Sequence, residues 1–171
     1  IWYILSKHIN ATAYKDKIDL TNEEFYGILR SMKDLPTTSQ PSPAVVADVY
    51  RELAAEGAEH IISIHISSDL SGTYQSSVLA AGMVEQEVAV HNFDSRSATM
   101  GLGLIVLSAA KMVEEGHSVE EILDSVKVVI QKLDLYFLLE SLDNLHKGGR
   151  IGKASHLFGS LLNIKPVLNL S

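Results

Sequence analysis

Short apolar runs that alternate with helical segments are the feature that most restricts the fold of this chain. Strand-like runs recur at residues 2–9, 61–66, 88–93, 135–139 and 164–170. Segments with helical spacing of apolar residues occur at residues 23–33, 43–56, 72–84, 97–115, 119–133 and 154–161. Apolar strands alternating with helices are typical of a parallel sheet covered by helices on both faces. The sequence therefore predicts an α/β fold with a mainly parallel sheet and flanking helices.

Capping residues fix where several of these helices begin. Thr21 with Glu24, and Ser118 with Glu121, have the spacing of a capping box, in which each residue's side chain bonds to the other's backbone. Ser42 is an N-cap candidate directly before a proline. The connecting segments are predicted to be irregular: a polar connection at 10–19, an extended proline-rich loop at 34–43 and a basic turn at 146–152.

Charge and composition exclude several classes of function. The formal net charge is −7, which argues against a nucleic-acid or anionic-membrane partner. The chain has no Cys, so disulfides, thiol chemistry and Cys-ligated metals are excluded, and a reducing cytoplasm is the expected location. The longest apolar stretch, at 100–110, is too short to cross a bilayer, so no stable membrane insertion is expected.

Hydroxyl-rich segments follow the predicted strands or loops at residues 37–42, 67–73 and 94–99. In parallel sheets, ligands bind beyond the carboxyl ends of the strands, next to helix N-termini. Unpaired backbone N–H groups there, joined by Ser and Thr hydroxyls, suit an anion such as a carboxylate. Gly72 lets the backbone approach a ligand closely. The alternative interpretation is a capped helix that binds nothing.

Two further segments carry candidate polar groups. Asp94 can accept hydrogen bonds from loop amides or take a proton in catalysis, and the structural role is favoured. Lys147, Arg150 and Lys153 gather in a glycine-containing turn of an otherwise acidic chain. Such a turn is either a solvated basic loop or a grip for phosphate or carboxylate, for which Arg is well shaped.

The histidines show no spacing typical of a metal site: His8, His60, His65, His91, His117, His146 and His156. No metal is predicted, and the phosphate-binding and dinucleotide-binding glycine motifs are absent. His65 near Ser71 leaves a serine-dependent hydrolase or acyl transferase open as an alternative function. The nucleophile-elbow motif of such hydrolases does not occur in the sequence.

Four motifs, in order and covering nearly the whole chain, resemble the DegV family of fatty-acid-binding proteins. They are TSQPSP at 38–43, SSDLSGTYQSS at 67–77, DSRSATMGLG at 94–103 and KGGRIGKASHLFGSLLNIKPVL at 147–168. The resemblance implies a lipid carrier without covalent chemistry of its own and without a cofactor. Its ligand would be a long-chain fatty acid such as palmitate, stearate or oleate. A fatty acid kinase subunit would phosphorylate the presented carboxylate for phospholipid synthesis.

The same resemblance implies roles for individual residues. Thr38 and Ser71 would hold the carboxylate, and Arg150 and Lys147 would face the kinase or the phosphate. Further ligand-binding positions are expected at Ser39, Ser68, Gly72 and Thr73.

The resemblance also implies a domain division. Residues 1–132 would form a first α/β domain that lacks its N-terminal strand, and 133–171 would begin a second, lipid-covering α/β domain. We therefore expect a chain truncated at both ends. A histidine that the family places near the head group would lie in the absent part, so none of the histidines here is assigned that role.

Overall fold

The computed structural model describes residues 6–9, 12–15, 18–32, 34–157 and 165–170. Backbone contacts divide the chain into two compact units. Unit 1 comprises Ile1–Pro41 and Leu139–Pro166, and unit 2 comprises Ser42–Leu138 and Val167–Ser171. The predicted domain division at residues 132 and 133 stays a prediction.

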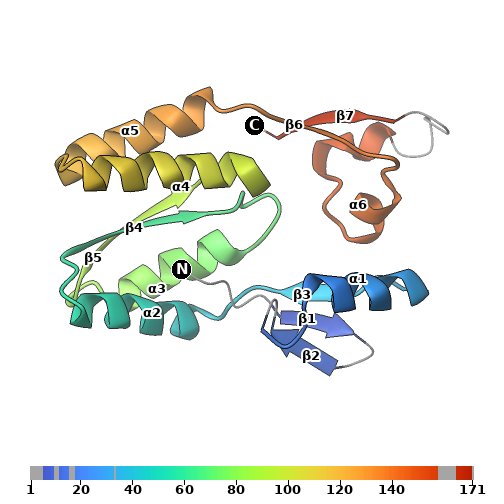
Figure 1. The fold of residues 1–171 in the computed structure, drawn as a ribbon, viewed down its shortest axis with the longest axis horizontal. Helices are drawn as coiled ribbons and strands as arrows, with labels where there is room; N and C mark the ends of the chain where they lie inside the picture. The colour runs from blue at the N-terminus through green and yellow to red at the C-terminus, as the bar shows by residue number, and fades with distance from the viewer. Residues whose placement is uncertain (1–5, 10–11, 16–17, 33, 158–164, 171) are drawn as a thin grey trace. The chain divides into compact units, whose positions relative to one another are not determined.

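Unit 2 is built on two parallel strands between two pairs of helices (Figure 1). The strands are β4 (His60–His65) and β5 (Ala89–Asp94). The helices are α2 (Pro43–Ala55), α3 (Thr73–Met83), α4 (Thr99–Glu114) and α5 (Val119–Lys132). The α/β class and the parallel pairing predicted from the alternation of elements are confirmed.

Side chains alternate between the two faces of β4 and so serve two separate cores. Ile61 packs with the buried residues of α2 and α3, whereas Ile62 and Ile64 pack against the cluster of α4 and α5. At the centre of the second cluster, Ile105 is completely buried. A strand buried on both faces reads as a continuous apolar run, which is why residues 61–66 were recognisable from sequence.

The predicted helix starts are confirmed by hydrogen bonds. Ser118 and Glu121 form both bonds of a capping box at α5, and Thr21 and Glu24 do so at α1 (Asn22–Ser31). The Ser42 hydroxyl accepts from the Val45 amide at the start of α2. These bonds satisfy amides that a helix leaves unpaired in its first turn.

A second strand pair in unit 2 is antiparallel. It joins β6 (Leu135–Leu138) to β7 (Val167–Leu170), with Leu135 opposite Leu170. Next to this pair, the side-chain amide of Asn169 donates to the Asp134 carboxylate at 3.2 Å. Both strands were predicted, and residue 164 of the predicted range lies outside the described residues.

Unit 1 contains a small antiparallel sheet in the order β2–β1–β3, and helix α1. Its strands are β1 (Ser6–Ile9), β2 (Thr12–Lys15) and β3 (Thr37–Ser39). Two predictions were wrong here: the polar connection at 10–19 contains β2, and the extended loop at 34–43 contains β3. Both strands take their backbone partners from β1, so their own sequences carry little signal.

Two short helical segments complete unit 1. Helix α6 (Asp143–Lys147) overlaps the segment predicted as a basic turn at 146–152. The N-cap residue Leu142 has no capping side chain, and Ser141 Oγ, which accepts from the Asp143 amide at 3.3 Å, is a local signal at the start of α6. The helix predicted at 154–161 is the 3₁₀ helix η1 (Gly152–Leu157), and residues 158–161 lie outside the described residues.

A buried polar network joins four elements of unit 2. The Tyr50 hydroxyl of α2 bonds to Ser63 Oγ of β4 at 2.7 Å and to Ser77 Oγ of α3 at 2.6 Å. It also donates to Asn92 Oδ1 of β5 at 3.3 Å, and Ser77 bonds to the same oxygen. Tyr50, Ser63, Ser77 and Asn92, here called the Tyr50 network, therefore hold α2 and α3 on one face of the parallel pair.

We expect Tyr50→Phe to lower the free energy of unfolding by about 1–3 kcal/mol, because buried partners lose a hydrogen bond. Urea unfolding at neutral pH measures the change. Tyr136→Phe is the matched control, since that side chain is 64% exposed and the same deletion there should cost less than about 0.5 kcal/mol. Equal stability of Tyr50→Phe and the parent protein would contradict a stabilising role for the network.

Candidate functional site

Two hydroxyl-rich loops meet at the carboxyl end of the parallel pair in unit 2. The first follows β4 and leads into α3, and the second follows β5 and leads into α4. The Ser67 amide donates to the Ser97 carbonyl at 2.9 Å, and the Ser95 amide donates to the His65 carbonyl at 3.0 Å. These bonds extend the pairing of the strands into the loops, so the loops are fixed against each other.

The Asp94 carboxylate organises this junction. It accepts from the Ser68 amide at 3.2 Å and from the Ser68 hydroxyl at 2.5 Å. It also accepts from the Arg96 amide at 2.9 Å, and Arg96 has a left-handed backbone with φ of 50°. A non-glycine residue in that conformation needs such support. The structural role predicted for Asp94 is therefore confirmed by its hydrogen bonds.

Ser71 and Thr73 form the head of helix α3. The two hydroxyls are 2.8 Å apart, and the Thr73 amide donates to Ser71 Oγ at 3.3 Å. Thr73 is buried and Ser71 is half-buried. When the Thr73 hydroxyl also donates to Ser71 Oγ, the Ser71 proton is left to donate to a further acceptor. The arrangement thus offers one polarised O–H group at the mouth of the loop.

The start of α3 adds positive potential beside that hydroxyl. Its N-cap is Gly72, which has no side chain to bond to the first-turn amides. Amides at the start of a helix, together with the helix dipole, favour a negative ligand. The helix start and the Ser71 hydroxyl are neutral groups that favour an anion, and the ligand roles predicted for Ser68, Ser71, Gly72 and Thr73 stay predictions.

The other predicted site residues belong to unit 1. Thr38 and Ser39 lie exposed on β3, where their backbones pair with Lys7 and Ser6 of β1. The predicted ligand residues are therefore divided between the units. Thr38 and Ser39 lie on β3 of unit 1, whereas the other four lie in the loop after β4 of unit 2: Ser68, Ser71, Gly72 and Thr73.

The two basic candidates also belong to unit 1. Lys147 ends α6, and Arg150 follows in the turn, with both side chains exposed. The Arg150 guanidinium donates to the Gly148 carbonyl at 2.7 Å. Their predicted roles toward a kinase or phosphate stay predictions.

His65 is tied to the Tyr50 network. Its Nε2 lies 2.7 Å from Ser63 Oγ, and its buried Nδ1 has no hydrogen-bond partner among the described residues. Burial lowers the pKa of His65, and the nearby Asp94 carboxylate opposes that shift. The hydroxyl of Ser71 bonds to Thr73, so the pairing of His65 with Ser71 that a serine hydrolase needs is not formed.

The network itself was missed by sequence reasoning. Tyr50 continues the apolar helical spacing of α2 and looks like an ordinary core residue. The only signal is Ser63, a polar residue inside an apolar strand, which requires a buried partner.

Two features of the described part of the chain bear on other functions. In that part no three or more His, Asp or Glu side chains are gathered as ready-made metal ligands. None of the described helices is both long and apolar enough to traverse a bilayer.

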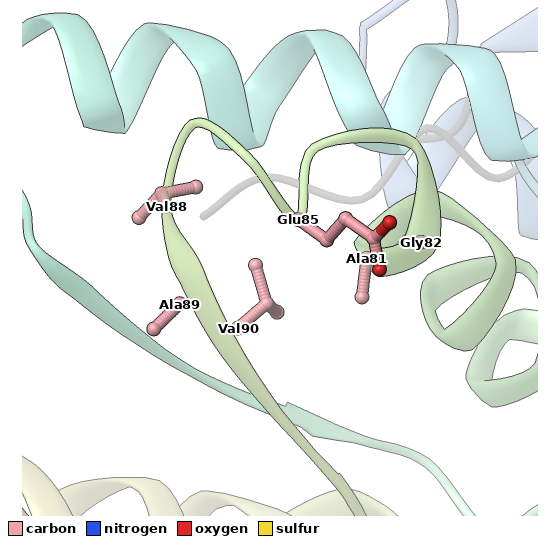
Figure 2. Close-up of a pocket in the computed structure, with 6 residues that line it drawn as sticks. All are labelled: Ala81, Gly82, Glu85, Val88, Ala89 and Val90. Atoms are coloured by element: carbon pink, nitrogen blue, oxygen red, sulfur yellow. The ribbon is translucent and has the colours of Figure 1, made fainter.

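A shallow pocket lies away from the hydroxyl loops, between the end of α3 and the start of β5 (Figure 2). Its volume is about 280 Å³, and its lining is mostly small or aliphatic: Ala81, Gly82, Glu85, Val88, Ala89 and Val90. Glu85 is its one charged group and bears the same charge as a fatty-acid carboxylate. The pocket therefore does not suit the head group of an anionic lipid.

Comparisons with known proteins point to one family. The family profile described as "Uncharacterised protein, DegV family" matches residues 4–171. A DegV domain-containing protein of Caldanaerobacter subterraneus subsp. tengcongensis is 40% identical over 96% of this chain. The chain spans 58% of the length of that relative.

Solved structures agree. The fatty-acid-binding DegV family protein of Thermus thermophilus superimposes with a TM-score of 0.84 at 40% identity. The match covers 98% of this chain and 59% of that protein. The stearic acid-binding protein of Eubacterium ventriosum gives a TM-score of 0.89 at 29% identity, over 99% of this chain and 59% of its own.

The lowered pKa of His65 predicts a pH dependence of stability. Below about pH 6.5 the His65 imidazole binds a proton in the unfolded chain, whereas in the folded protein it stays neutral to a lower pH. The free energy of unfolding contributed by His65 is therefore complete at neutral pH and is lost as the pH falls below about 6.5. NMR titration of the imidazole, with urea unfolding at neutral and mildly acidic pH, measures both effects. Titration of His65 at or above the pKa of an unfolded histidine would contradict the prediction.

Proposed function

We propose that this chain, which belongs to the DegV family, binds the carboxylate of a long-chain fatty acid at the hydroxyl loop of unit 2. The observation that carries the proposal is the Ser71–Thr73 pair at the start of α3. With the Thr73 hydroxyl as donor, the Ser71 oxygen accepts from both the Thr73 amide and the Thr73 hydroxyl, and the Ser71 proton can donate to a ligand oxygen. The dipole of α3 adds to that donor and favours an anionic acceptor.

Thr38 is the second proposed carboxylate ligand. The resemblance of TSQPSP at 38–43 to the family motif supports this role, and its hydroxyl is exposed on β3. Ser39 is its neighbour on the same strand. Ser68 and Thr73 are engaged by Asp94 and Ser71, so we assign them the positioning of the loop around the ligand.

Neutral hydroxyls suffice for this task because the tail supplies most of the binding free energy. Each buried CH₂ group contributes about 0.8 kcal/mol, so a chain such as that of palmitate, stearate or oleate gains several kcal/mol from burial alone. The head group must only keep its hydrogen bonds after leaving water. The relatives of known structure that bind fatty acids support this class of ligand.

The whole protein's role is part of the proposal, since the chain spans 58% of its relative. We propose a non-enzymatic carrier without a cofactor, which presents the bound carboxylate to a fatty acid kinase for conversion to an acyl phosphate. Residues 133–171 would begin the domain that covers the lipid. Arg150 and Lys147, exposed at the end of α6 and in the turn after it, would face the kinase or the transferred phosphate.

Ser71→Ala and Thr38→Val in the intact protein are expected to lower fatty-acid occupancy after purification at least about tenfold when combined, since two hydrogen bonds to a charged group are lost. Native mass spectrometry, followed by organic extraction, measures occupancy and identifies the acid. Ser108→Ala and Thr37→Val delete the same groups outside the proposed site and should retain lipid. Wild-type occupancy in the double variant would disprove the head-group assignment. A mass shift that survives denaturation would instead indicate an acyl-enzyme.

Arg150→Glu is expected to reduce phosphorylation of the bound fatty acid by a fatty acid kinase subunit at least about tenfold, because charge reversal at a docking contact slows association. Fatty-acid occupancy should remain unchanged. Arg30→Glu makes the same charge change on α1 of unit 1, and the fatty acid bound to this variant should be phosphorylated by the kinase at the normal rate. A normal rate with Arg150→Glu would contradict the role of Arg150 in presentation.

A further inference from the structure

We infer that His60 and His91, on adjacent parallel strands of unit 2, form the protein ligands of a transition-metal site. His60 begins β4 and His91 is the third residue of β5, and both belong to the face covered by α4 and α5. The pair lies near the amino ends of the strands. The hydroxyl loops follow the other ends of the strands, about 16 Å from His60 and about 10 Å from His91 at about 3.3 Å per residue. The inference therefore does not rest on the proposed fatty-acid function.

The spacing of the two rings is that of neighbouring ligands on one ion. His60 Nδ1 and His91 Nε2 are 3.1 Å apart. Two imidazole nitrogens bound to Zn²⁺ at about 2.0–2.1 Å with a tetrahedral angle lie about 3.3–3.4 Å apart, so the two rings need to separate by only about 0.2–0.3 Å. The ring planes differ by 20°, with centroids 5.4 Å apart, so the two nitrogens face each other. Rotation about χ2, which is a soft torsion in histidine, turns both lone pairs toward one ion.

Binding requires a change of tautomer and no change of oxidation state. In the metal-free pair, one ring donates its N–H to the other. When the ion enters, that proton moves to the second nitrogen of the same ring, through water, and both facing nitrogens become ligands. Each ring remains neutral, so no net proton is released from the neutral pair.

The surroundings favour a cation and leave it accessible. His60 is exposed and His91 is half-buried. The Glu120 carboxylate, in the first turn of α5, acts electrostatically on His91. Water molecules would complete the ligand set.

The chemical class of the ion follows from the ligands. Two imidazole nitrogens favour Zn²⁺, Ni²⁺ or Cu²⁺ over Mg²⁺ and Ca²⁺, which prefer sets of oxygen atoms. With two histidines and open positions, the site resembles an exchangeable site more than a closed structural one.

Calorimetric titration of the purified protein with Zn²⁺ at neutral pH tests the inference. We expect one ion to bind, and His60→Gln or His91→Gln to weaken binding at least about tenfold, since even loss of an outer contact to a ligand costs about 10–100-fold. His117→Gln is the matched control, because His117 lies beside Glu115 and Glu121 and is the obvious rival ligand. Its affinity for Zn²⁺ should equal that of the parent protein.

A second measurement locates the ion directly. In the parent protein, Ni²⁺ should broaden the imidazole NMR signals of His60 and His91 before those of other histidines. Absence of Zn²⁺ binding, or binding that persists in both single variants, would overturn the inference. Loss of binding in His117→Gln alone would assign the ion to the rival site and would equally overturn it.

Discussion

The parallel pairing of β4 with β5 is the interaction on which the rest of unit 2 depends. It runs in register from His60 opposite Ala89 to His65 opposite Asp94. Because the strands are parallel, both following loops leave from the same edge, and backbone bonds between the loops continue the ladder there. The hydroxyl groups of one loop and the Asp94 carboxylate that orders it are neighbours for this reason. The same register also brings His60 and His91 together at the opposite edge.

The elements that the sequence predicted well are those whose signals are local. Helices α2 and α5 carry apolar spacing along their own length, and Ser42 and Ser118 mark their starts within the segment itself. The exposed strands β2 and β3 exist because β1 offers backbone partners on both sides. That information lies in another part of the chain, so residue type within three or four positions could not reveal them.

The residues of the candidate site likewise fall into those with a local sequence signal and those whose partners are distant in sequence. Residue type alone located the hydroxyl-rich loop after β4 and favoured the structural role of Asp94, whereas the ligand role of the loop stays a prediction. The Tyr50 network could not be predicted, because Tyr50 finds its partners on β4, α3 and β5, which are distant in sequence. Thr38 and Arg150 differ again: their proposed roles rest on the family resemblance, and their side chains are simply exposed on unit 1.

In the proposed carrier function, neutral donors would suit the anionic head group for a chemical reason. A buried arginine would bind a carboxylate strongly and in a fixed bidentate geometry, and it would neutralise the oxygens that must attack a phosphoryl group. A serine hydroxyl and a helix start hold the same group with about 1.5–3 kcal/mol per hydrogen bond and leave its charge available. Affinity then comes from the tail, which takes no part in the reaction. The chain has a net charge of −7. A serine hydroxyl and a helix start are therefore donors that would allow both binding and release of the carboxylate without a positively charged side chain.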